Sequence, residues 1–474
     1  MKIHFIVPKS RPLDRLYGCI YAFFVQHNIF LLSAATMLKK QGHEVEVTDL
    51  NVDGNQSLQQ LVAGDNADAY AFYSIFLSRD VDLEAADEIT ATKGHVPIVF
   101  MGSDPSYRPE AYLQRKNHFV VRGEPEHTIA DLFQNLYSPG EVEGLSYVRN
   151  GGPVDNPMRS HIQNLDALPF PDRGLLKNPG KYSNPRFKRY PSTTVLASRG
   201  CAYRCRFCVP NSLSFARELE WKRFQPGKPP VTQRSPQNVA AELELIAEQG
   251  YRSVQIVDDM FPWGARRTIE ICKRIKHLNL ELSCLARADA LLDEDVVKEM
   301  AEAGFHHVDM GLESFNQAIL DDIHKNLKVQ DFFKAYSLLR EHDIEPEVNI
   351  LLGSSPLETR ETLKTTEKTL QEVNPGILHC QVCAPFPGTE FYQIAKTNGW
   401  MITDDYVPID PTTNALISYP HLTSRDLEDA VRRMNRNHYL RPSYLLKQLT
   451  QVRSMTELSC KVATALQMMK KWGW

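Results

Sequence analysis

Short apolar runs alternate with longer segments of helical spacing along the first 140 residues of the chain. Five runs predict strands, at residues 2–7, 43–49, 69–73, 97–101 and 119–121. Between them apolar residues recur at helical spacing, as in residues 29–40, which end just before Gly42. Strands that alternate with helices in this way favour a doubly wound parallel sheet. We therefore expect an α/β, Rossmann-like domain over residues 1–140.

A second alternation of strands and helices begins at residue 193. Strands are predicted at residues 194–197, 253–257, 281–285, 307–310, 347–352 and 378–383, with helices between them, for example at 236–249 and 294–303. Six such units are fewer than the eight that close a full barrel, so an open, partial (β/α)6 barrel is expected over residues 193–395. Residues 141–192 are rich in proline and predict an extended connector. Residues 396–474 predict a helical C-terminal extension.

Small and polar residues follow several predicted strands of the first domain. Ligands of doubly wound sheets bind at the carboxyl ends of the strands. Small residues there let a large flat ligand approach the backbone. The candidate ligand-binding residues at this edge are Ser74, Phe76, Gly102, Ser103, Gly123 and Glu124.

Composition fits a globular enzyme with a sizeable core. A length of 474 residues indicates two or three domains. The chain is 42% hydrophobic and 24% charged, which is enough apolar sequence for a sizeable core. A net charge of −4 gives no electrostatic case for binding nucleic acid. Nine cysteines do not make a disulfide scaffold, and the first seven residues predict a strand and not a signal peptide. The apolar stretch at residues 20–32 is too short and too polar to span a bilayer, so we expect a cytoplasmic protein.

Three cysteines carry the clearest chemistry of the chain. Cys201, Cys205 and Cys208 follow the spacing Cys-x3-Cys-x2-Cys. Three thiolates on one short loop can bind three irons of a 4Fe–4S cluster and leave the fourth iron open to a small molecule. Zinc sites usually combine Cys-x2-4-Cys with a second pair of ligands downstream, and no convincing second pair follows. The alternative is three free thiols in a reducing cytosol.

The cysteine run resembles the signature of the radical S-adenosylmethionine superfamily. The resemblance includes Phe207 before the third cysteine and Arg199-Gly200 before the first. The order of the two halves, with residues 42–49, 121–126 and 165–171, resembles the class B enzymes of that family, which carry a cobalamin-binding domain ahead of the radical domain. It implies a 4Fe–4S cluster, S-adenosylmethionine and cobalamin as cofactors.

The first domain departs from many cobalamin proteins in one respect. Residues 1–140 contain no Asp-x-His-x-x-Gly motif, so the cobalt would lack a histidine on its lower face. Phe76, in the loop after the third predicted strand, is the candidate for the nearest side chain. A sheet domain that has lost its cofactor and serves as scaffold is the alternative.

Several residues at the ends of the barrel strands suit S-adenosylmethionine. Asp258 or Asp259 could bind its ammonium group, although either could instead cap the next helix. Ser283 and Arg287 lie four residues apart around the end of the third barrel strand. Arginine suits the carboxylate because its planar fork matches two oxygens, and Asp289 could orient it.

Further ligands are implied by the resemblance alone. It places Phe207 near the adenine, and it makes Glu313, in a Gly-x-Glu-Ser element, a candidate for the ribose. Gly353 lies where family members often have a glycine-rich turn.

The resemblance also implies the reaction. One electron from the cluster cleaves S-adenosylmethionine, and the 5′-deoxyadenosyl radical removes hydrogen from an unactivated position of the substrate. We expect a cobalamin-dependent methyltransferase acting on carbon or phosphorus, with a flavodoxin or ferredoxin as electron donor and a small-molecule or lipid-like substrate. Radical cyclisation or oxidative rearrangement without methyl transfer is one alternative, and a non-catalytic cobalamin or Fe–S sensor is another. No catalytic side chain, substrate or oligomeric state can be predicted.

Three further segments leave alternatives open. Residues 211–223 predict a helix that either covers the active site or lies on the surface. Cys380 and Cys383 could bind a second metal, but residues i and i+3 of a strand point to opposite faces. Residues 455–472 predict a helix packed on the barrel, or one that makes peripheral contact with a membrane.

Overall fold

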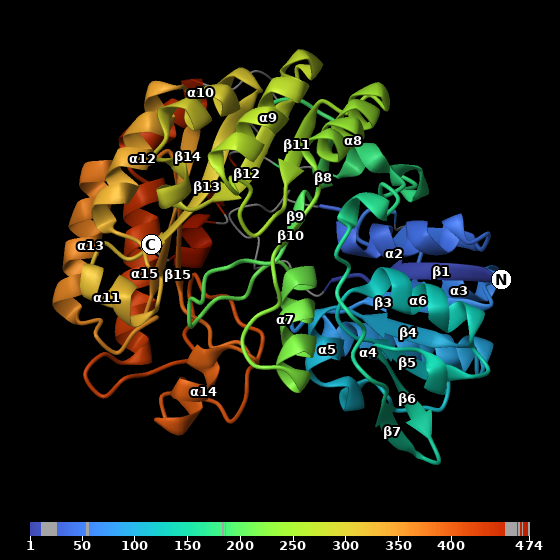
Figure 1. Ribbon diagram of the computed structural model, residues 1–474. Helices are drawn as coiled ribbons and strands as arrows, with labels where there is room; N and C mark the ends of the chain where they lie inside the picture. Colours follow the sequence, from blue (N-terminus) through green and yellow to red (C-terminus); the bar gives the residue numbers. More distant parts are fainter. Residues whose placement is uncertain are drawn as a thin grey trace. The chain divides into compact units, whose positions relative to one another are not determined.

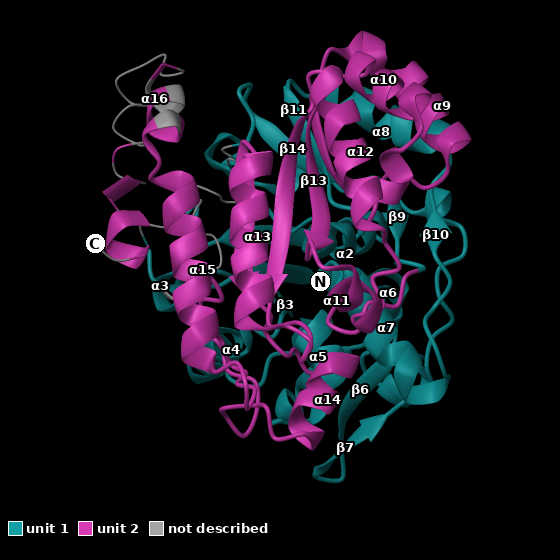
Figure 2. Ribbon diagram, turned by 90° about the vertical axis from the view of Figure 1, so that its left-hand side faces the viewer, with its two compact units in different colours: residues 1–14, 25–202, 209–259 teal, residues 15–24, 203–208, 260–474 magenta. Residues whose placement is uncertain are grey.

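The computed structural model describes residues 1–10, 26–53, 56–182, 184, 186–450, 462, 465, 466 and 468–472. Clustering of the backbone divides the chain into two compact units, which are coloured separately in Figure 2. Unit 1 comprises residues 1–14, 25–202 and 209–259, and unit 2 comprises residues 15–24, 203–208 and 260–474. The two units are described one after the other.

A seven-stranded sheet forms the centre of the N-terminal part of unit 1 (Figure 1). Its strand order is β2-β1-β3-β4-β5-β6-β7. The first five strands pair in parallel and confirm the five predicted strands: β1 (Lys2–Val7), β2 (Glu44–Asp49), β3 (Ala69–Tyr73), β4 (Ile98–Met101) and β5 (His118–Val121). The helices between them are α2 (Ile29–Lys40), α3 (Leu58–Gly64), α4 (Arg79–Lys93), α5 (Ser103–Tyr107) and α6 (Pro125–Gln134).

Both faces of this sheet are covered. Alternate strand residues point to opposite faces, so Phe5 and Ala71 pack in one apolar core with residues of α2 and α6. Tyr70 and Phe72 pack in a second core with residues of α3 and α4. Helices on both faces of a parallel sheet define the doubly wound architecture that the sequence predicts.

The sheet extends into the proline-rich segment that the sequence predicts to be a connector. Two strands, β6 (Leu145–Arg149) and β7 (Gly152–Asp155), form a hairpin that adds antiparallel strands to the edge of the sheet at β5. Asn150 and Gly151 form its two-residue turn, and both have positive φ, of 53° and 83°. The sheet is therefore mixed, and not parallel throughout.

Unit 1 also contains the first two strands of the predicted barrel. These are β8 (Ser192–Val195) and β11 (Ser253–Ile256), which pair in parallel. Between them lie β9 (Ser198–Arg199), β10 (Thr232–Gln233), α7 (Ser212–Phe224) and α8 (Pro236–Glu248), with β9 and β10 antiparallel.

Unit 2 contains the other four predicted barrel strands, in the order β15-β14-β13-β12 and all parallel. They are β12 (Glu281–Ala286), β13 (Phe305–Glu313), β14 (Glu345–Leu352) and β15 (Ile377–Val382). Helices alternate with them: α9 (Ala265–Ile275), α10 (Glu294–Glu302), α11 (Gln317–Asp322), α12 (Val329–Glu341) and α13 (Arg360–Val373). One face of these strands is apolar and buried. On that face the Cys380 Sγ lies 3.8 Å from the Met434 Sδ of a C-terminal helix.

The C-terminal part is largely helical, as predicted, with α14 (Glu390–Thr397), α15 (Ser424–Tyr439) and α16 (Pro442–Thr450). Most of the helix predicted at 455–472 lies outside the described residues. At its end, Trp472 is buried and stacks on Tyr439 at 5.8 Å between ring centroids, and Lys471 pairs with Asp410 at 2.7 Å. Within the described ranges, no helix is long and apolar enough to cross a membrane.

Candidate functional site

The three cysteines of the Cys-x3-Cys-x2-Cys run are half-buried, and none of them is in a disulfide. In the part of the chain that the structure describes, no three His, Cys, Asp or Glu side chains converge where one ion could bind. In a 4Fe–4S cubane each thiolate binds a different iron, so a single-ion arrangement is not what the loop needs. Three thiols within eight residues are the donor set that such a cluster requires.

The middle of the cysteine loop, residues 203–208, belongs to unit 2 and is held in that unit through its backbone. The Arg206 N–H donates to the Ile323 carbonyl at 3.0 Å, and the Arg206 carbonyl accepts from the Phe391 N–H at 2.9 Å. The Arg206 Nη1 also pairs with Asp322 at 3.2 Å. The neighbouring Phe207, the predicted adenine contact, is half-buried on this loop.

Asp289 orients Arg287, as the sequence suggested. The Arg287 Nε and Nη2 donate to the two carboxylate oxygens of Asp289 at 3.0 and 2.9 Å, and its guanidinium lies 3.5 Å from the ring centroid of Tyr203. Burial lowers the pKa of Arg287, but hydrogen bonds to Asp289 and its charge, with the nearby Cys205, more than offset this and raise it. The result is a fixed cation close to one cluster cysteine.

Glu313 lies at the end of β13 with the unusual backbone angle φ +77°. Its Oε1 accepts from the Lys325 Nζ at 2.8 Å, and both side chains are about nine-tenths buried. A Cβ at Gly311 would lie 2.8 Å from the Glu313 Oε1 and 3.1 Å from the Lys325 Nζ, so this glycine leaves room for the ion pair.

Lys325 is a site residue that the sequence did not reveal. Burial lowers its pKa, but the charges of Glu313 and Cys205 raise it above its ordinary value. Lys325 lies in a short connection between α11 and α12, where no pattern distinguishes it from a surface lysine. Glu313, Lys325 and Arg287 thus form a charged group near Cys205 within unit 2.

The structure separates the two aspartates that the sequence left equivalent. Asp258 is fully buried, and its oxygens accept from the Ala197 N–H and the Ser198 hydroxyl, both at 2.6 Å. Asp259 accepts from the Asn211 N–H at 2.7 Å, but its Oδ2 is buried without a hydrogen-bond partner. Burial raises the pKa of Asp259. Asp259 is therefore the better placed of the two to meet an added ammonium group.

Ser283 and Gly353 differ in what they offer a ligand. Ser283 is buried on β12, and its hydroxyl has no hydrogen-bond partner. At Gly353, with φ +71°, the N–H donates to the Glu358 carboxylate and the carbonyl accepts from the Tyr419 hydroxyl at 2.8 Å. The Gly353 turn is thus fixed by buried groups, and burial raises the pKa of Glu358 to about 7.

The predicted cobalamin residues of the third and fourth strand ends are packed against one another. The Ser74 hydroxyl donates to the buried Asp82 carboxylate at 2.6 Å. A Cβ at Gly102, where φ is +113°, would lie 2.3 Å from the Ser74 carbonyl oxygen. Only glycine can therefore occupy position 102. Ser103 is buried at the start of α5.

Phe76 is 6% exposed, and its ring lies 5.7 Å from that of Tyr107 and 5.9 Å from that of Phe215. Phe215 belongs to α7, the helix that follows the cysteine loop. This helix is buried from Leu213 to Glu220, which excludes the alternative of a plain surface helix.

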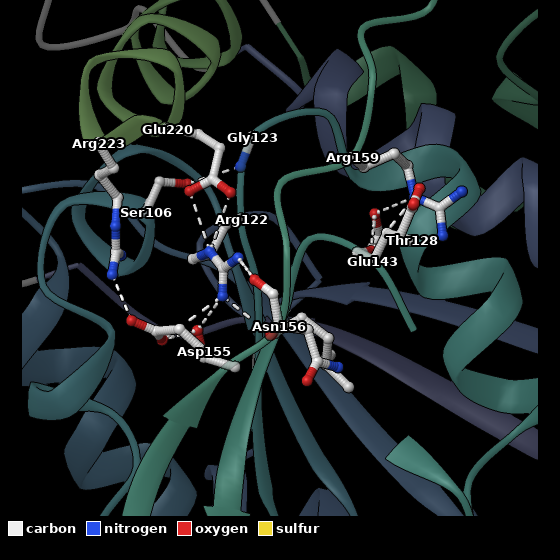
Figure 3. A network of polar contacts seen from close by, with 12 residues as sticks. Ser106, Arg122, Gly123, Thr128, Glu143, Asp155, Asn156, Arg159, Glu220 and Arg223 are labelled. Atoms are coloured by element: carbon white, nitrogen blue, oxygen red, sulfur yellow. Dashed lines mark hydrogen bonds and ion pairs between the residues drawn. The ribbon is translucent and has the colours of Figure 1, made fainter. Parts of the chain in front are cut away.

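Arg122 organises the loop after β5 (Figure 3). Its side chain has no exposed surface, and its Nε donates to Glu220 of α7 at 2.9 Å. Its Nη groups donate to the Ser146 hydroxyl at 2.5 Å and to the Asn156 carbonyl at 2.6 Å. Next to it, the Gly123 N–H donates to the Ser106 hydroxyl at 3.0 Å. The predicted ligand loop is therefore tied both to α7 and to the β6–β7 hairpin.

Glu124 is held by cations and not left open to a ligand. Burial raises the pKa of Glu124, but His161, Arg199 and Arg217 lower it far more, so it lies well below its ordinary value. A carboxylate with these partners offers a cofactor little beyond its backbone. Cobalamin without a histidine ligand fits this edge, because the described loops after β3, β4 and β5 hold no histidine. His27, in the connection after β1, is buried and bonded to the Thr193 hydroxyl at 2.8 Å. The ligand would therefore be recognised through backbone and shape.

Cys380 and Cys383 are buried free thiols. Burial raises the pKa of Cys380 and of Cys383, so both favour the neutral thiol. Together with the sulfur contact of Cys380 to Met434, this favours packing over a second metal site.

Two family models match the chain. The model of the B12 binding domain matches residues 19–133, and the model of the radical SAM superfamily matches residues 195–370. Each model therefore covers one of the two predicted halves, in the predicted order.

Known proteins resemble the chain over most of its length. An uncharacterised methyltransferase of Pyrococcus horikoshii is 30% identical over 365 residues, 75% of this chain and 75% of that protein. An anaerobic magnesium-protoporphyrin IX monomethyl ester cyclase of Rubrivivax gelatinosus is 27% identical over 58% of this chain and 48% of its own length. The solved structure of the cobalamin-dependent S-adenosylmethionine radical enzyme OxsB, with aqua-cobalamin and S-adenosylmethionine bound, has a TM-score of 0.73 at 16% identity, over 99% of this chain and 72% of that one. That likeness shows the fold.

Proposed function

Because the chain belongs to the cobalamin-dependent radical S-adenosylmethionine enzymes, we propose that it transfers a methyl group to an unactivated carbon or phosphorus of its substrate. The observation that carries the proposal is the similarity to a methyltransferase over three quarters of both chains. Two features of the chain support the proposal. The doubly wound domain precedes the three cysteines, and the buried charged group of Arg287, Glu313 and Lys325 follows them in the sequence.

The residues of unit 2 would bind and orient S-adenosylmethionine. Arg287, fixed by Asp289, presents a guanidinium to its carboxylate, and Lys325 adds a second positive charge nearby. Glu313 would accept from the ribose hydroxyls, and the unpartnered Ser283 hydroxyl is available to the ligand. Bound together, the cluster, S-adenosylmethionine and cobalamin supply one-electron and methyl-transfer chemistry.

The residues of unit 1 would contribute Asp259 and the loops of the first domain. The buried Asp259 Oδ2 without a partner can accept from an added ammonium group. The loops at residues 74–78 and 102–107 would approach the lower face of cobalamin. Their tight mutual packing would hold that surface in one shape.

The polarity of β12–β15 favours a polar substrate over a lipid-like one. Residues on the face opposite the apolar helix-packed face are half-buried in alternation: Leu285, Asp309, Asn349, His379 and Gln381. The Asn349 amide donates to the Asp309 carboxylate within this face. A hydrocarbon placed there would strip water from the donors and acceptors that such bonds leave over. None of the strand residues on this face is Lys or Arg. Arg287 and Lys325, beyond the strand ends, would be taken up by S-adenosylmethionine, so a phosphate would find little counter-charge. We infer a neutral or cationic substrate rich in hydroxyl, amide or amine groups.

The remaining partners follow from this activity. The cluster needs one electron for each turnover, and we propose a flavodoxin or ferredoxin as its donor in the cytoplasm. The peripheral membrane contact suggested by the C-terminal sequence stays a prediction. The buried Trp472 at the end of that segment supports packing against the protein.

The test is product analysis of the protein reconstituted without oxygen and supplied with cobalamin, S-adenosylmethionine, a reductant and polar metabolite fractions. Methyl transfer predicts S-adenosylhomocysteine and 5′-deoxyadenosine in comparable amounts. A protein with Cys201, Cys205 and Cys208 all replaced by alanine should form neither and serves as the control. Failure to form S-adenosylhomocysteine with any substrate, while the cluster and cobalamin are both bound, would contradict the proposal.

A radical cyclase is the second candidate, and the similarity to the magnesium-protoporphyrin cyclase favours it. It predicts 5′-deoxyadenosine without S-adenosylhomocysteine in the same experiment. Formation of neither product with intact cofactors would favour a sensor.

A further inference from the structure

A buried arginine lies two residues before the first cluster cysteine and is bound by two carboxylates. Arg199, at the end of β9, has 5% of its side chain exposed. Its Nη1 donates to the Glu124 Oε1 at 2.6 Å, and its Nη2 donates to the Glu126 Oε1 at 2.6 Å. Glu124 and Glu126 are 5% and 1% exposed. A guanidinium can bridge two carboxylates because it presents several N–H groups in one plane, whereas lysine is a single point charge.

Both carboxylates are fixed where the β5–α6 loop enters α6, at the carboxyl edge of the first domain. Glu124 is the N-cap residue of α6, and its Oε2 accepts from the Ile162 N–H at 2.9 Å. Glu126 lies in the first turn of that helix, and its Oε1 accepts from the Ser33 hydroxyl at 2.7 Å. Since neither carboxylate can turn away without losing these bonds, the position of Arg199 is defined by this loop.

A second buried arginine completes the group. The Arg217 side chain of α7 has no exposed surface, and its Nε lies 3.4 Å from the Glu124 Oε1. Its Nη1 would lie 3.1 Å from a Cβ at Gly200, so the Arg217 guanidinium lies against the residue that precedes Cys201. The Gly200 N–H donates to the Ser214 hydroxyl of the same helix at 2.9 Å.

We propose that Arg199 is a positioning residue that joins the strand leading into the cluster cysteines to the β5–α6 loop of the cobalamin domain, so that the two segments move together. The proposal rests on the proposed function for the identity of the two cofactors. Occupation of the first domain by cobalamin is then felt at Cys201 through Glu124, Glu126 and Arg199, without any contact between the two cofactors.

The first test needs no cofactor. Amide hydrogen exchange is measured on the full unliganded chain, in peptides covering residues 121–127 and 196–202. Arg199→Lys is expected to increase exchange about tenfold in residues 121–127, and Glu126→Gln to do so in residues 196–202. Each substitution is thus expected to act on the other segment. The proposal would be overturned if each substitution changed exchange only in the segment that contains it.

The matched control is Arg173→Lys. Arg173 is equally buried and pairs with Glu242 at 2.8 Å and with the Thr193 hydroxyl at 2.9 Å, but with no residue of the β5–α6 loop. It should leave residues 121–127 unchanged, and an equal increase there would show that any buried arginine has this effect. If Arg199→Lys folds poorly, the charge-balanced pair Arg199→Met with Glu126→Gln replaces it, because it leaves Glu124 paired with Arg217.

The second test reads the cluster itself. The reduced cluster with S-adenosylmethionine bound is examined by electron paramagnetic resonance before and after addition of hydroxocobalamin. The wild-type spectrum should shift, whereas Arg199→Lys, with iron, sulfide and cobalamin loading equal to wild type, should show no shift. A variant that keeps the full shift would overturn the proposal. If the wild type binds no hydroxocobalamin, the proposed function fails, and the exchange experiment still decides the role of Arg199.

Discussion

Glu313 illustrates how single residues of the site depend on their neighbours. A non-glycine residue with φ of +77° costs of the order of 1 kcal/mol or more, and such residues persist where the surroundings hold them in place. Here Lys325 donates to the Glu313 carboxylate, in space that is open because Gly311 has no Cβ. A strained acidic residue beside a buried cation is a common feature of ligand sites.

Removing the Lys325 charge should weaken binding of S-adenosylmethionine. In Lys325→Met the buried Glu313 carboxylate loses its cation, and the methionine carboxylate loses a nearby positive charge. We expect at least a tenfold rise in the dissociation constant of the reconstituted protein, measured by isothermal titration. The exposed Lys328 of the same connection is the control, because Lys328→Met should leave the affinity unchanged. Equal affinity in both variants would remove Lys325 from the site.

Glu358 predicts a pH dependence of stability. Burial raises the pKa of its carboxyl from about 4.5 to about 7. The neutral form is therefore the one favoured in the folded state, and its contribution is complete below pH 4.5 and lost as the pH rises through 7. By linkage the loss amounts to as much as about 3 kcal/mol.

The measurement for Glu358 is the free energy of unfolding in urea at pH 5 and at pH 8. Glu358→Gln should remove most of the loss between these values and be the more stable protein at pH 8. If the wild type and the variant lose stability in parallel, Glu358 does not carry this dependence.

At the scale of elements, helix α7 belongs with the first domain. It follows the cysteine loop in sequence, but Glu220 binds Arg122 (Figure 3), and Phe215 packs on Phe76. The sequence leaves open a lid or a surface helix because its charged residues do not reveal which of them are buried. Glu220 is 3% exposed, whereas Lys222 and Arg223 of the same helix are exposed, and the sequence does not reveal this difference.

Breaking the Glu220 pair should destabilise unit 1. Glu220→Ala leaves the buried Arg122 guanidinium with only the longer contact to the Asp155 carboxylate, at 3.4 Å, and loss of one partner of a buried pair costs about 3 to 5 kcal/mol. Arg223→Ala, in the same helix, breaks a half-exposed pair with Asp155 and should cost less than about 1 kcal/mol. The free energy of unfolding in urea is measured for both variants. Similar losses in the two would contradict the claim that the buried Arg122–Glu220 pair stabilises unit 1.

The hairpin β6–β7 shows why one element was missed. Asn150-Gly151 is a strong two-residue hairpin signal because both positions require positive φ. The proline-rich composition around it favours a connector, and Pro153 argues against a strand. Because β7 is the edge strand, Pro153 needs no ladder partner on its open side. Whether a strand can contain proline depends on its position at the edge of the folded sheet, and local composition does not reveal that position.

For the whole molecule, the sequence predicted the order of cofactor domains and eleven strands of the two α/β parts, because apolar periodicity and the cysteine spacing are local. It could not show that Glu124 is held by Arg199, since these residues lie 75 positions apart. Nor could it distinguish Asp258 from Asp259, because their partners come from other segments. The ends of strands are predictable, whereas the pairing of charges between loops depends on the fold.

The measurement that tests the account most directly follows the methyl group of S-adenosylmethionine. The reconstituted protein is incubated with trideuteromethyl-labelled S-adenosylmethionine, a reductant and separate polar and lipid extracts, and the products are examined by mass spectrometry. Methyl transfer to a polar substrate predicts one compound of the polar extract that gains a trideuteromethyl group in place of hydrogen, with 5′-deoxyadenosine formed alongside. Formation of 5′-deoxyadenosine with no labelled product in either extract would contradict methyl transfer, and a labelled lipid would contradict the polar substrate.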